Sequence, residues 1–287
     1  MTEKFSSLAS VSATRERLLE LGITTKKSLG QHFLIDDGVV GKILRLAALA
    51  PGTKVLEVGP GIGTLTEALL AQQIELTAVE LDSALLASLA GRYPTLGLIG
   101  GDALSSKTVA CLQELAPTVM VANLPYAVAA TIILEYFQVL PGLEAATVMV
   151  QREVAERIAA EPGSKAYGAY TVKLGLLAKT VDQFKVSPQC FYPPPRVDSA
   201  VIRLERVRPY DELITTASML ADAAFYQRRK TIKNSMQAYF AAHALDRDSV
   251  EGLLSTAQIA PTCRGETLSP EAFLNMASVR QRNGFRD

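Results

Sequence analysis

The sequence has few of the side chains that build metal centres and disulfide frameworks. Its 287 residues include three cysteines, Cys111, Cys190 and Cys263, and two histidines, His32 and His243. The cysteines lie far apart and match no metal-binding spacing, and two histidines cannot by themselves complete a metal cluster. We therefore expect no metal site. A sparse, odd number of cysteines is typical of a protein kept in a reducing cytosol.

Long apolar runs are also absent. No stretch approaches the ~18–20 apolar residues that cross a bilayer. Residues 1–17 contain no compact apolar core of the signal-peptide type. Because 48% of the residues are apolar and 20% are charged, the chain can still bury a large core, which excludes wholesale disorder. We expect a cytoplasmic protein with no membrane partner.

The sequence has no excess of charge of either sign, with 29 basic and 29 acidic side chains. This balance argues against a strongly basic nucleic-acid-binding protein. The distribution is nevertheless uneven, since residues 51–150 carry 3 basic and 9 acidic side chains and residues 151–209 carry 10 and 6. A local basic surface is therefore compatible with a neutral chain.

Short apolar segments alternate with helical patterns in the first two thirds of the chain. Strands are predicted over residues 54–58, 76–81, 96–100, 119–123 and 146–151. This alternation predicts an α/β fold with a mostly parallel, Rossmann-like sheet, in which ligands bind beyond the carboxyl ends of the strands.

The pattern changes later in the chain and suggests a second domain. Residues 180–188 and 199–207 are predicted to be extended, and a proline-rich loop joins them. From about residue 210 the pattern is helical, including a helix over residues 211–240. We predict an N-terminal extension (1–24), a Rossmann-like domain (25–208) and a small α-helical C-terminal domain (209–287).

A glycine-rich turn, Gly59-Pro60-Gly61-Ile62-Gly63, follows the first of these strands. Such a turn lets backbone approach a ligand closely, and the N-terminus of the next helix favours a negative group. Glu80, at the end of the following strand, can accept hydrogen bonds from two ribose hydroxyls. The glycine spacing differs from GxGxxG and so favours a nucleoside without a pyrophosphate, such as S-adenosylmethionine. A tight turn without a ligand is the alternative.

Two more strand ends carry polar residues. Asp102 can bind the adenine amino group of such a cofactor, or it can act as a helix N-cap. Asn123-Leu124-Pro125-Tyr126 offers two acceptors, the Asn123 side-chain oxygen and the Leu124 carbonyl, to the weakly nucleophilic amine of a substrate adenine. Pro125 stiffens the peptide, and Tyr126 can stack on the base. The alternative is a proline turn with a core tyrosine.

A series of separated motifs keeps a recognisable order along the chain. They are Gly30-Gln31-His32-Phe33-Leu34, Glu57-Val58-Gly59-Pro60-Gly61, Glu80-Leu81-Asp82, Gly101-Asp102-Ala103, Asn123-Leu124-Pro125-Tyr126, Gln151-Arg152-Glu153-Val154, Tyr167-Gly168, Phe191-Tyr192-Pro193-Pro194-Pro195-Arg196-Val197-Asp198-Ser199 and Phe225-Tyr226-Gln227-Arg228-Arg229-Lys230. Over about residues 25–240, this order resembles the ribosomal RNA adenine N6,N6-dimethyltransferases, in particular the bacterial group that acts on the small subunit.

The resemblance implies a class I S-adenosylmethionine-dependent methyltransferase fold. It implies dimethylation of two adjacent adenosines in the 3′-terminal hairpin loop of 16S rRNA, within the small ribosomal subunit or its precursor. It also implies that six residues contact the cofactor: His32, Leu34, Gly59, Glu80, Asp102 and Asn123. We expect Gly61 of the glycine turn to contact the cofactor as well. One departure from the family pattern, Ala127-Val128-Ala129 after the tyrosine, puts local hydrogen bonds beside the base in question.

Further residues are expected at the RNA. Phe191 precedes the proline loop and is expected to close on the other face of a flipped adenine, completing a catalytic set with Asn123, Leu124, Pro125 and Tyr126. A basic cluster predicted on a helix is expected to contact RNA phosphates, unless it is only a solvated face. The cluster consists of Arg228, Arg229, Lys230 and Lys233.

Two other interpretations remain open. The same chemistry could act on large-subunit rRNA or on adenine in DNA. Alternatively, the chain could be a non-catalytic ribosome-assembly factor, whose mark would be a damaged glycine turn or Asn123–Tyr126 motif. Both motifs are intact, so the sequence favours an enzyme, which we expect to be a monomer.

Overall fold

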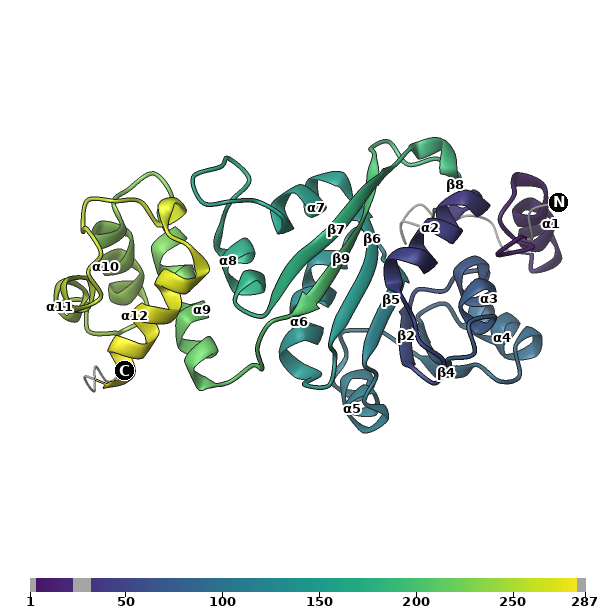
Figure 1. Cartoon of the computed structure of the whole chain (residues 1–287), viewed down its shortest axis with the longest axis horizontal. Coiled ribbons are helices and arrows are strands. Elements are labelled where there is room, and N and C mark those ends of the chain that lie inside the picture. Colours follow the sequence, from purple (N-terminus) through teal and green to yellow (C-terminus); the bar gives the residue numbers. More distant parts are fainter. Residues whose placement is uncertain (1–3, 23–31, 283–287) are drawn as a thin grey trace. The chain divides into compact units, whose positions relative to one another are not determined.

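The computed structural model describes residues 4–22 and 32–282. The chain forms two compact units (Figure 1). The first takes the described residues up to Ala155 together with Thr180–Arg206, and the second takes Glu156–Lys179 with the described residues from Val207 onward. Residues 156–179, which the predicted domain limits assign to the Rossmann-like domain, therefore belong to the same compact unit as the C-terminal helices. The limits themselves stay a prediction.

The larger of two sheets has seven strands in the order β4-β3-β2-β5-β6-β9-β7. Pairing is parallel from β4 to β6, and β9 runs antiparallel to β6. The five strands predicted between residues 54 and 151 are confirmed to within one residue, whereas the segment predicted over residues 180–188 is displaced by two residues. The strands are β2 (Lys54–Val58), β3 (Glu75–Glu80), β4 (Gly97–Gly100), β5 (Val119–Asn123), β6 (Ala145–Gln151), β7 (Ala178–Val186) and β9 (Ser199–Arg206).

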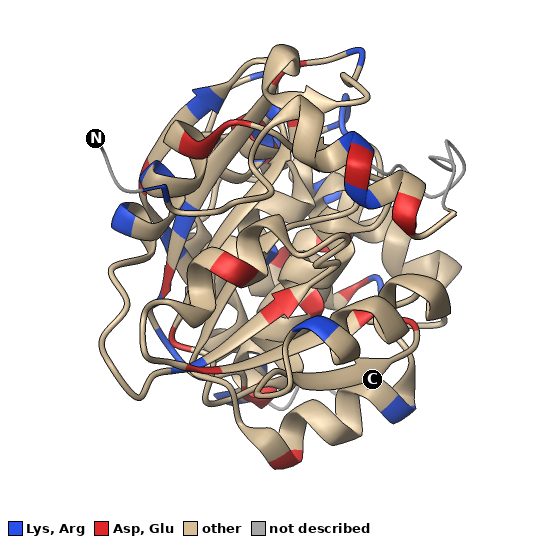
Figure 2. Ribbon diagram, turned by 90° about the vertical axis from the view of Figure 1, so that its right-hand side faces the viewer, with Lys and Arg blue, Asp and Glu red and all other residues tan. Residues whose placement is uncertain are grey.

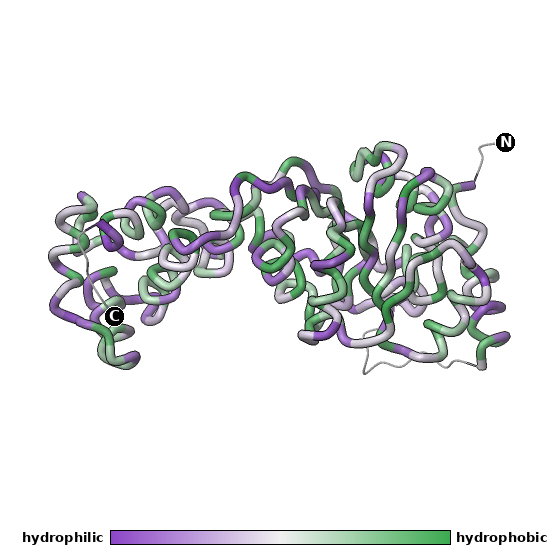
Figure 3. Tube along the Cα trace, turned by 90° about the horizontal axis from the view of Figure 1, so that it is seen from below, coloured by the Kyte–Doolittle hydropathy of each residue, from purple (hydrophilic) through white to green (hydrophobic). Residues whose placement is uncertain are grey.

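The central strands are buried on both faces, as expected for parallel strands covered by helices. In β6, every residue except the last is buried. Figure 3 shows hydrophobic stretches alternating with hydrophilic ones along the trace. The helices that connect or precede the strands of the first unit are α1 (Val11–Glu20), α2 (Asp37–Ala47), α3 (Thr64–Leu70), α4 (Ser83–Arg92), α5 (Ser106–Leu115) and α6 (Ala129–Val139).

A second, two-stranded sheet joins β1 (Phe33–Leu34) to β8 (Phe191–Tyr192) in antiparallel register. Phe33 pairs with Tyr192, and Leu34 pairs with Phe191. This pairing places β1 beside the proline-rich loop, which lies more than 150 residues later in the sequence.

The remaining helices lie beyond residue 151. Helix α7 (Arg152–Ile158) crosses the division between the units, and the second unit contains α8 (Ala169–Gly175), α9 (Glu212–Phe225), α10 (Ile232–Ala242), α11 (Ser249–Thr256) and α12 (Pro270–Arg282). The single helix predicted over residues 211–240 is wrong, because a turn separates α9 from α10. Thr231 begins α10 as its N-cap, accepting a hydrogen bond from the Asn234 amide.

Candidate active site

A cavity of about 300 Å³ lies at the carboxyl ends of β2, β3 and β5. Ligands of open parallel sheets bind at such strand ends. Among its lining residues are ten of the predicted site residues: His32, Leu34, Gly59, Gly61, Glu80, Asp102, Asn123, Leu124, Pro125 and Tyr126. The structure brings this set together, while the individual roles stay predictions.

The glycine turn forms one wall of the cavity. Gly59 and Gly61 have φ angles of 70° and 61°, in the left-handed region that side chains disfavour. A Cβ added to Gly61 would also lie 3.0 Å from the ring of Phe33. The turn therefore needs glycine both for its backbone conformation and for close packing.

Glu80 is fixed at the end of β3 by backbone donors. The Gly61 amide donates to Glu80 Oε2 at 3.1 Å, and the Asp82 amide donates to Glu80 Oε1 at 2.9 Å. Burial raises the pKa of Glu80, while the backbone hydrogen bonds act in the opposite direction. The Leu81 amide is a third backbone donor to this carboxylate. Because a carboxylate has about four lone-pair sites, it can still accept from a ligand.

Glu57 and Thr64 also line the cavity, although sequence reasoning gave neither a role. Glu57 is 1% exposed. Desolvation raises the pKa of Glu57 to about 8, although the Thr66 hydroxyl donates to this carboxyl at 2.7 Å. The Thr64 hydroxyl is buried and has no hydrogen-bond partner among the described residues. A hydroxyl directly after a glycine turn was the available sequence signal for Thr64.

Asp102 lies beyond the end of β4. Its Oδ1 accepts from the Leu104 amide at 2.9 Å, which closes a local turn. The alternative role as helix N-cap is wrong, because Ser105 is the N-cap of α5 and accepts from the Thr108 amide.

Asn123 and His32 are linked across the cavity wall. Asn123 Nδ2 donates to the His32 carbonyl at 3.2 Å, so Oδ1 is the side-chain atom that can accept from a substrate amine. His32 Nδ1 lies 2.8 Å from the Pro193 carbonyl. These contacts tie the end of β5 to the proline-rich loop.

Tyr126 is held by its ring and by its hydroxyl. Its ring stacks with that of His32 at 5.5 Å between centroids. Its hydroxyl lies 2.6 Å from Ser199 Oγ, and burial raises its pKa. Ser199 was quoted in a sequence motif without a role, and the structure identifies it as the hydroxyl partner of Tyr126.

The structure places Phe191 differently from the prediction. The side chain is 2% exposed, belongs to the hydrophobic core and is not among the residues that line the cavity. The reason is the pairing of β8 with β1, which sets Phe191 opposite Leu34 and turns its ring into the core. In this arrangement the Phe191 ring is buried and its strand partner Leu34 lines the cavity, while the contact of Phe191 with a flipped adenine stays a prediction.

The basic cluster also differs from the prediction. Arg228, Arg229 and Lys230 lie in the turn between α9 and α10, and only Lys233 lies on a helix. Arg228 contacts Glu266 at 3.2 Å and donates to the Lys165 carbonyl, and Lys233 is paired with Glu251. No ion pair of Arg229 or Lys230 occurs within residues 4–22 and 32–282.

The cavity differs from the rest of the chain in its charges. Figure 2 shows basic and acidic residues interspersed along the ribbon. By contrast, the described lining residues include three carboxyl groups, Glu57, Glu80 and Asp102, and no Lys or Arg. The described residues contain no cluster of His, Cys, Asp and Glu that could hold a metal ion. Within the described ranges, no helix has the length and apolar character needed to cross a membrane.

Comparison with protein families gives one decisive match. The model described as ribosomal RNA adenine dimethylase matches residues 22–280. The chain belongs to the ribosomal RNA adenine dimethylase family. The predicted class of enzyme, an rRNA adenine N6,N6-dimethyltransferase, is thereby confirmed.

Relatives within this family match over nearly their whole length. The chain is 40% identical to a ribosomal RNA small subunit methyltransferase A of Streptomyces coelicolor, covering 92% of this chain and 93% of the relative. It is 39% identical to the protein of the same description from Thermobifida fusca, covering 98% of this chain and 100% of the relative.

Solved structures confirm the methyltransferase fold. A dimethyladenosine transferase from Plasmodium falciparum matches with a TM-score of 0.70 and 24% identity, over 88% of this chain and 99% of that chain. The 23S rRNA methyltransferase ErmE matches with a TM-score of 0.61 and 26% identity, over 86% and 98%. The fold shown by these structures is therefore consistent with membership of the rRNA adenine dimethylase family.

Proposed function

We propose that the cavity binds S-adenosylmethionine and that the enzyme uses it to dimethylate N6 of two adjacent adenosines in the 3′-terminal hairpin loop of 16S rRNA. The observation that carries the cofactor proposal is a cavity that offers the carboxyl groups of Glu80 and Asp102 as acceptors and whose described lining has no Lys or Arg. Such a lining offers a pyrophosphate no cationic side chain as a partner and suits a ligand with sulfonium and ammonium charges.

The residues present fit this cofactor. Glu80 would accept hydrogen bonds from the ribose hydroxyls through the lone pairs that its backbone donors leave free. Asp102 would accept from the adenine amine, and the glycine turn would hold the amino-acid end. The unpartnered buried hydroxyl of Thr64 supports the presence of a polar ligand here, because an unsatisfied buried hydroxyl is costly.

Methyl transfer depends mainly on positioning. When bound, S-adenosylmethionine supplies an electrophilic methyl group attached to a good leaving group. Asn123 Oδ1 and the Leu124 carbonyl accept from the adenine amine and direct its lone pair. The Leu124 peptide is held by its amide, which donates to the Met149 carbonyl at 3.1 Å. Tyr126, fixed by Ser199, stacks on the base. The proton of the alkylated amine leaves to water, so no general base is required.

The small-subunit target is supported by the descriptions of the relatives, which name small-subunit rRNA. Exposed Arg229 and Lys230 are available for phosphate contacts that carry no sequence information. The enzyme would act as a monomer in the cytoplasm, where small subunits or their precursors are present.

The second candidate target is large-subunit rRNA. The observation that favours it is the structural match to ErmE, which is described as a 23S rRNA methyltransferase. The fold and cavity are compatible with both targets, because the methyl acceptor is an adenine amine in each case.

The test is methyl transfer from labelled S-adenosylmethionine to purified small subunits, large subunits and DNA, with Asn123→Ala as the inactive control. We expect incorporation only into small subunits, at adenine N6, with two methyl groups on each modified base. Incorporation into large subunits or DNA would contradict the proposed target, and no binding of the cofactor would contradict the proposed site.

A further inference from the structure

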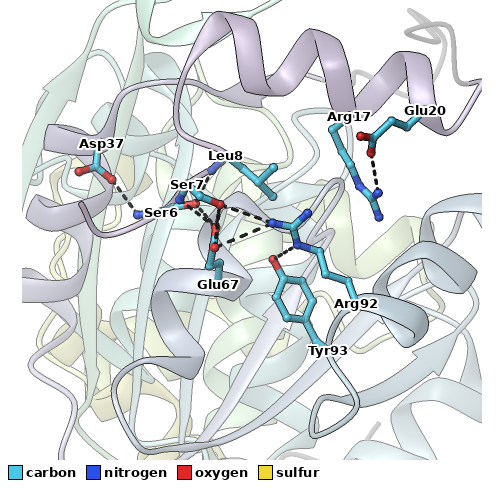
Figure 4. Close-up of polar contacts among 9 residues, drawn as sticks. All are labelled: Ser6, Ser7, Leu8, Arg17, Glu20, Asp37, Glu67, Arg92 and Tyr93. Carbon is cyan, nitrogen blue, oxygen red and sulfur yellow. Dashed lines mark hydrogen bonds and ion pairs between the residues drawn. The ribbon is translucent and has the colours of Figure 1, made fainter. Parts of the chain in front are cut away.

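The N-terminal segment, residues 5–20, takes no part in the function proposed above, yet it is firmly anchored on the first unit (Figure 4). Ser6, Leu8 and Leu18 are only 2%, 4% and 5% exposed. The segment ends in α1, whose N-cap Ser10 accepts from the Ala13 amide. We call residues 5–20 the N-terminal brace. Since burial of this extent requires specific contacts, the brace is part of the folded unit.

The first anchor is polar and lies on α3, the helix that opens directly after the glycine turn. Glu67 accepts from the Ser6 hydroxyl at 2.9 Å, and from the Ser7 amide and hydroxyl at 3.0 and 2.8 Å. Arg92 lies 3.4 Å from the Ser7 hydroxyl and 3.9 Å from Glu67, and it also donates to the Tyr93 hydroxyl (Figure 4). The brace is therefore tied to the helix that carries the turn.

The second anchor is polar and lies on α2. Asp37 accepts from the amides of Phe5 and Ser6 at 3.1 and 2.8 Å. The Phe5 ring lies directly over Gly41, where any added Cβ would collide with it. This close approach fixes the start of the brace.

The third anchor is apolar and reaches the cavity itself. Leu18 packs in one buried cluster with Phe33, Ile62 and Leu85. Ile62 lies within the glycine turn, and Phe33 and Leu85 line the cavity. The Phe33 ring also touches the turn, because a Cβ on Gly61 would lie 3.0 Å from it.

A fourth contact joins the brace to the proline-rich loop. The Arg15 guanidinium lies over the Tyr192 ring, 5.0 Å from its centroid. Tyr192 pairs with Phe33 in the two-stranded sheet. The brace thus contacts the two-stranded sheet twice, through Leu18 in the cluster with Phe33 and through Arg15 on Tyr192, the strand partner of Phe33.

From these contacts we infer that the N-terminal brace positions the cofactor cavity, with Leu18 as the positioning residue that keeps Phe33 and the glycine turn in their binding geometry. The inference rests on the proposed function, because the ligand is S-adenosylmethionine. Leu18 is not among the residues that line the cavity. It acts by preorganising the groups that do, and preorganisation lowers the cost of ordering a site on binding.

The test compares two leucine-to-alanine substitutions at adjacent positions of α1. Leu18→Ala removes the buried side chain, and Leu19→Ala removes one that is 81% exposed. Leu112→Ala, in the core at α5 and outside the cavity lining, controls for general loss of stability. The cofactor Kd is measured by calorimetry well below each variant's Tm. Hydrogen exchange of the Gly61 and Gly63 amides is measured without cofactor.

Leu18→Ala should raise the Kd for S-adenosylmethionine about tenfold through lost preorganisation and speed exchange at both amides. Leu19→Ala should change neither readout, and Leu112→Ala should lower Tm without changing the Kd. If Leu18→Ala does not fold, Leu18→Val is measured in its place, with a smaller rise in Kd expected. Unchanged Kd and unchanged exchange in a folded Leu18 variant would overturn the inference. Wild-type protein that does not bind the cofactor would instead contradict the proposed function, while the exchange data would still test the brace.

Discussion

The cofactor cavity and the basic cluster place their polar side chains by different means. In the cavity, Glu80 is fixed by the amides of Gly61 and Asp82, and Asn123 is fixed by the His32 carbonyl. In the basic cluster, Arg228 and Lys233 form ion pairs with Glu266 and Glu251, from later in the chain, and Arg228 also donates to the Lys165 carbonyl. The polar groups of the cavity take backbone partners, whereas the ion pairs of the cluster depend on single carboxylate side chains from later in the chain.

This difference separates what each group can do. A carboxylate or amide held by backbone keeps a defined direction and suits the orientation of a ligand or a reacting amine. An exposed ion pair contributes only about 0–1 kcal/mol, so Arg228 and Lys233 can exchange their partners for phosphates at a modest cost. Single substitutions in the cavity should therefore change the methyl-transfer rate or the cofactor affinity strongly. Substitutions in the basic cluster should change RNA affinity only weakly.

The largest effect is expected for Asn123→Ala. Its acceptor contact becomes more important as the adenine nitrogen turns tetrahedral, so its loss lowers the chemical rate. One positioned polar contact at a reacting centre is worth roughly 10²–10³ in rate. The measurement is single-turnover methyl transfer at saturating cofactor and small subunit, with folding checked separately. A rate within a few-fold of wild type would remove Asn123 from the catalytic role.

Next in size is the effect of Glu80→Ala on cofactor affinity. Loss of hydrogen bonds to a charged acceptor costs ~1.5–3 kcal/mol, or roughly ten- to hundredfold in Kd. Glu75→Ala is the matched control, because Glu75 lies at the exposed opposite end of the same strand. Calorimetry that gives folded Glu80→Ala the affinity of the control would refute the ribose assignment.

The next effect is on stability within each pH unit and follows from the buried carboxyl of Glu57, whose pKa burial raises to about 8. Between about pH 5 and pH 8 the unfolded chain ionises at this residue while the folded state keeps the proton. Stability contributed by the protonated form is therefore lost as pH rises, by at most about 1.4 kcal/mol per pH unit.

The test for Glu57 is the Tm of wild type and of Glu57→Gln across this pH range. The Gln carbonyl can still accept from Thr66 and cannot ionise, so this variant should gain Tm relative to wild type as pH rises. Glu75→Gln, at an exposed position, serves as the control and should show no such trend. A Tm difference between Glu57→Gln and wild type that stays constant with pH would contradict ionisation-linked destabilisation at this residue.

The smallest effects per substituted residue are expected in the basic cluster. Removing Arg229 and Lys230 together should weaken RNA binding and reduce the log–log salt slope by up to about two units, one per lost phosphate contact. Removing Arg228 and Lys233 should change the slope less, because both are ion-paired in the free protein. Salt titrations of RNA affinity for the two double variants measure the difference, and the cofactor Kd should stay constant in both. Equal slopes for the wild type and both double variants would identify the whole cluster as a solvated face.

The strand ends were predictable from the sequence for a physical reason. Parallel strands bring their carboxyl ends to one edge of the sheet, so Gly59, Glu80, Asp102 and Asn123 could be expected to meet there. Their convergence required only the identification of apolar segments and of the residues that end them. The resemblance to a known family added His32 and Leu34, which no strand pattern would have indicated.

The remaining features depend on contacts between distant residues. Burial of Phe191 follows from its register opposite Leu34, and no local pattern encodes that pairing. The break in the helix predicted over residues 211–240 follows from Thr231, whose capping role competes with helix continuation. The anchoring of the N-terminal brace depends on Glu67 and Asp37, whose acceptor roles become visible only in the folded chain.

The central claim is that this enzyme uses the cavity at the strand ends to dimethylate adenosines of small-subunit rRNA. The most direct measurement locates methylated adenines in ribosomal RNA from cells that lack this protein, complemented with either the wild type or Asn123→Ala. The account predicts that two adjacent N6,N6-dimethyladenosines in the 3′-terminal hairpin loop of 16S rRNA disappear without the protein and return only with the wild type. Their presence without the protein, or their return with a folded Asn123→Ala variant, would contradict it.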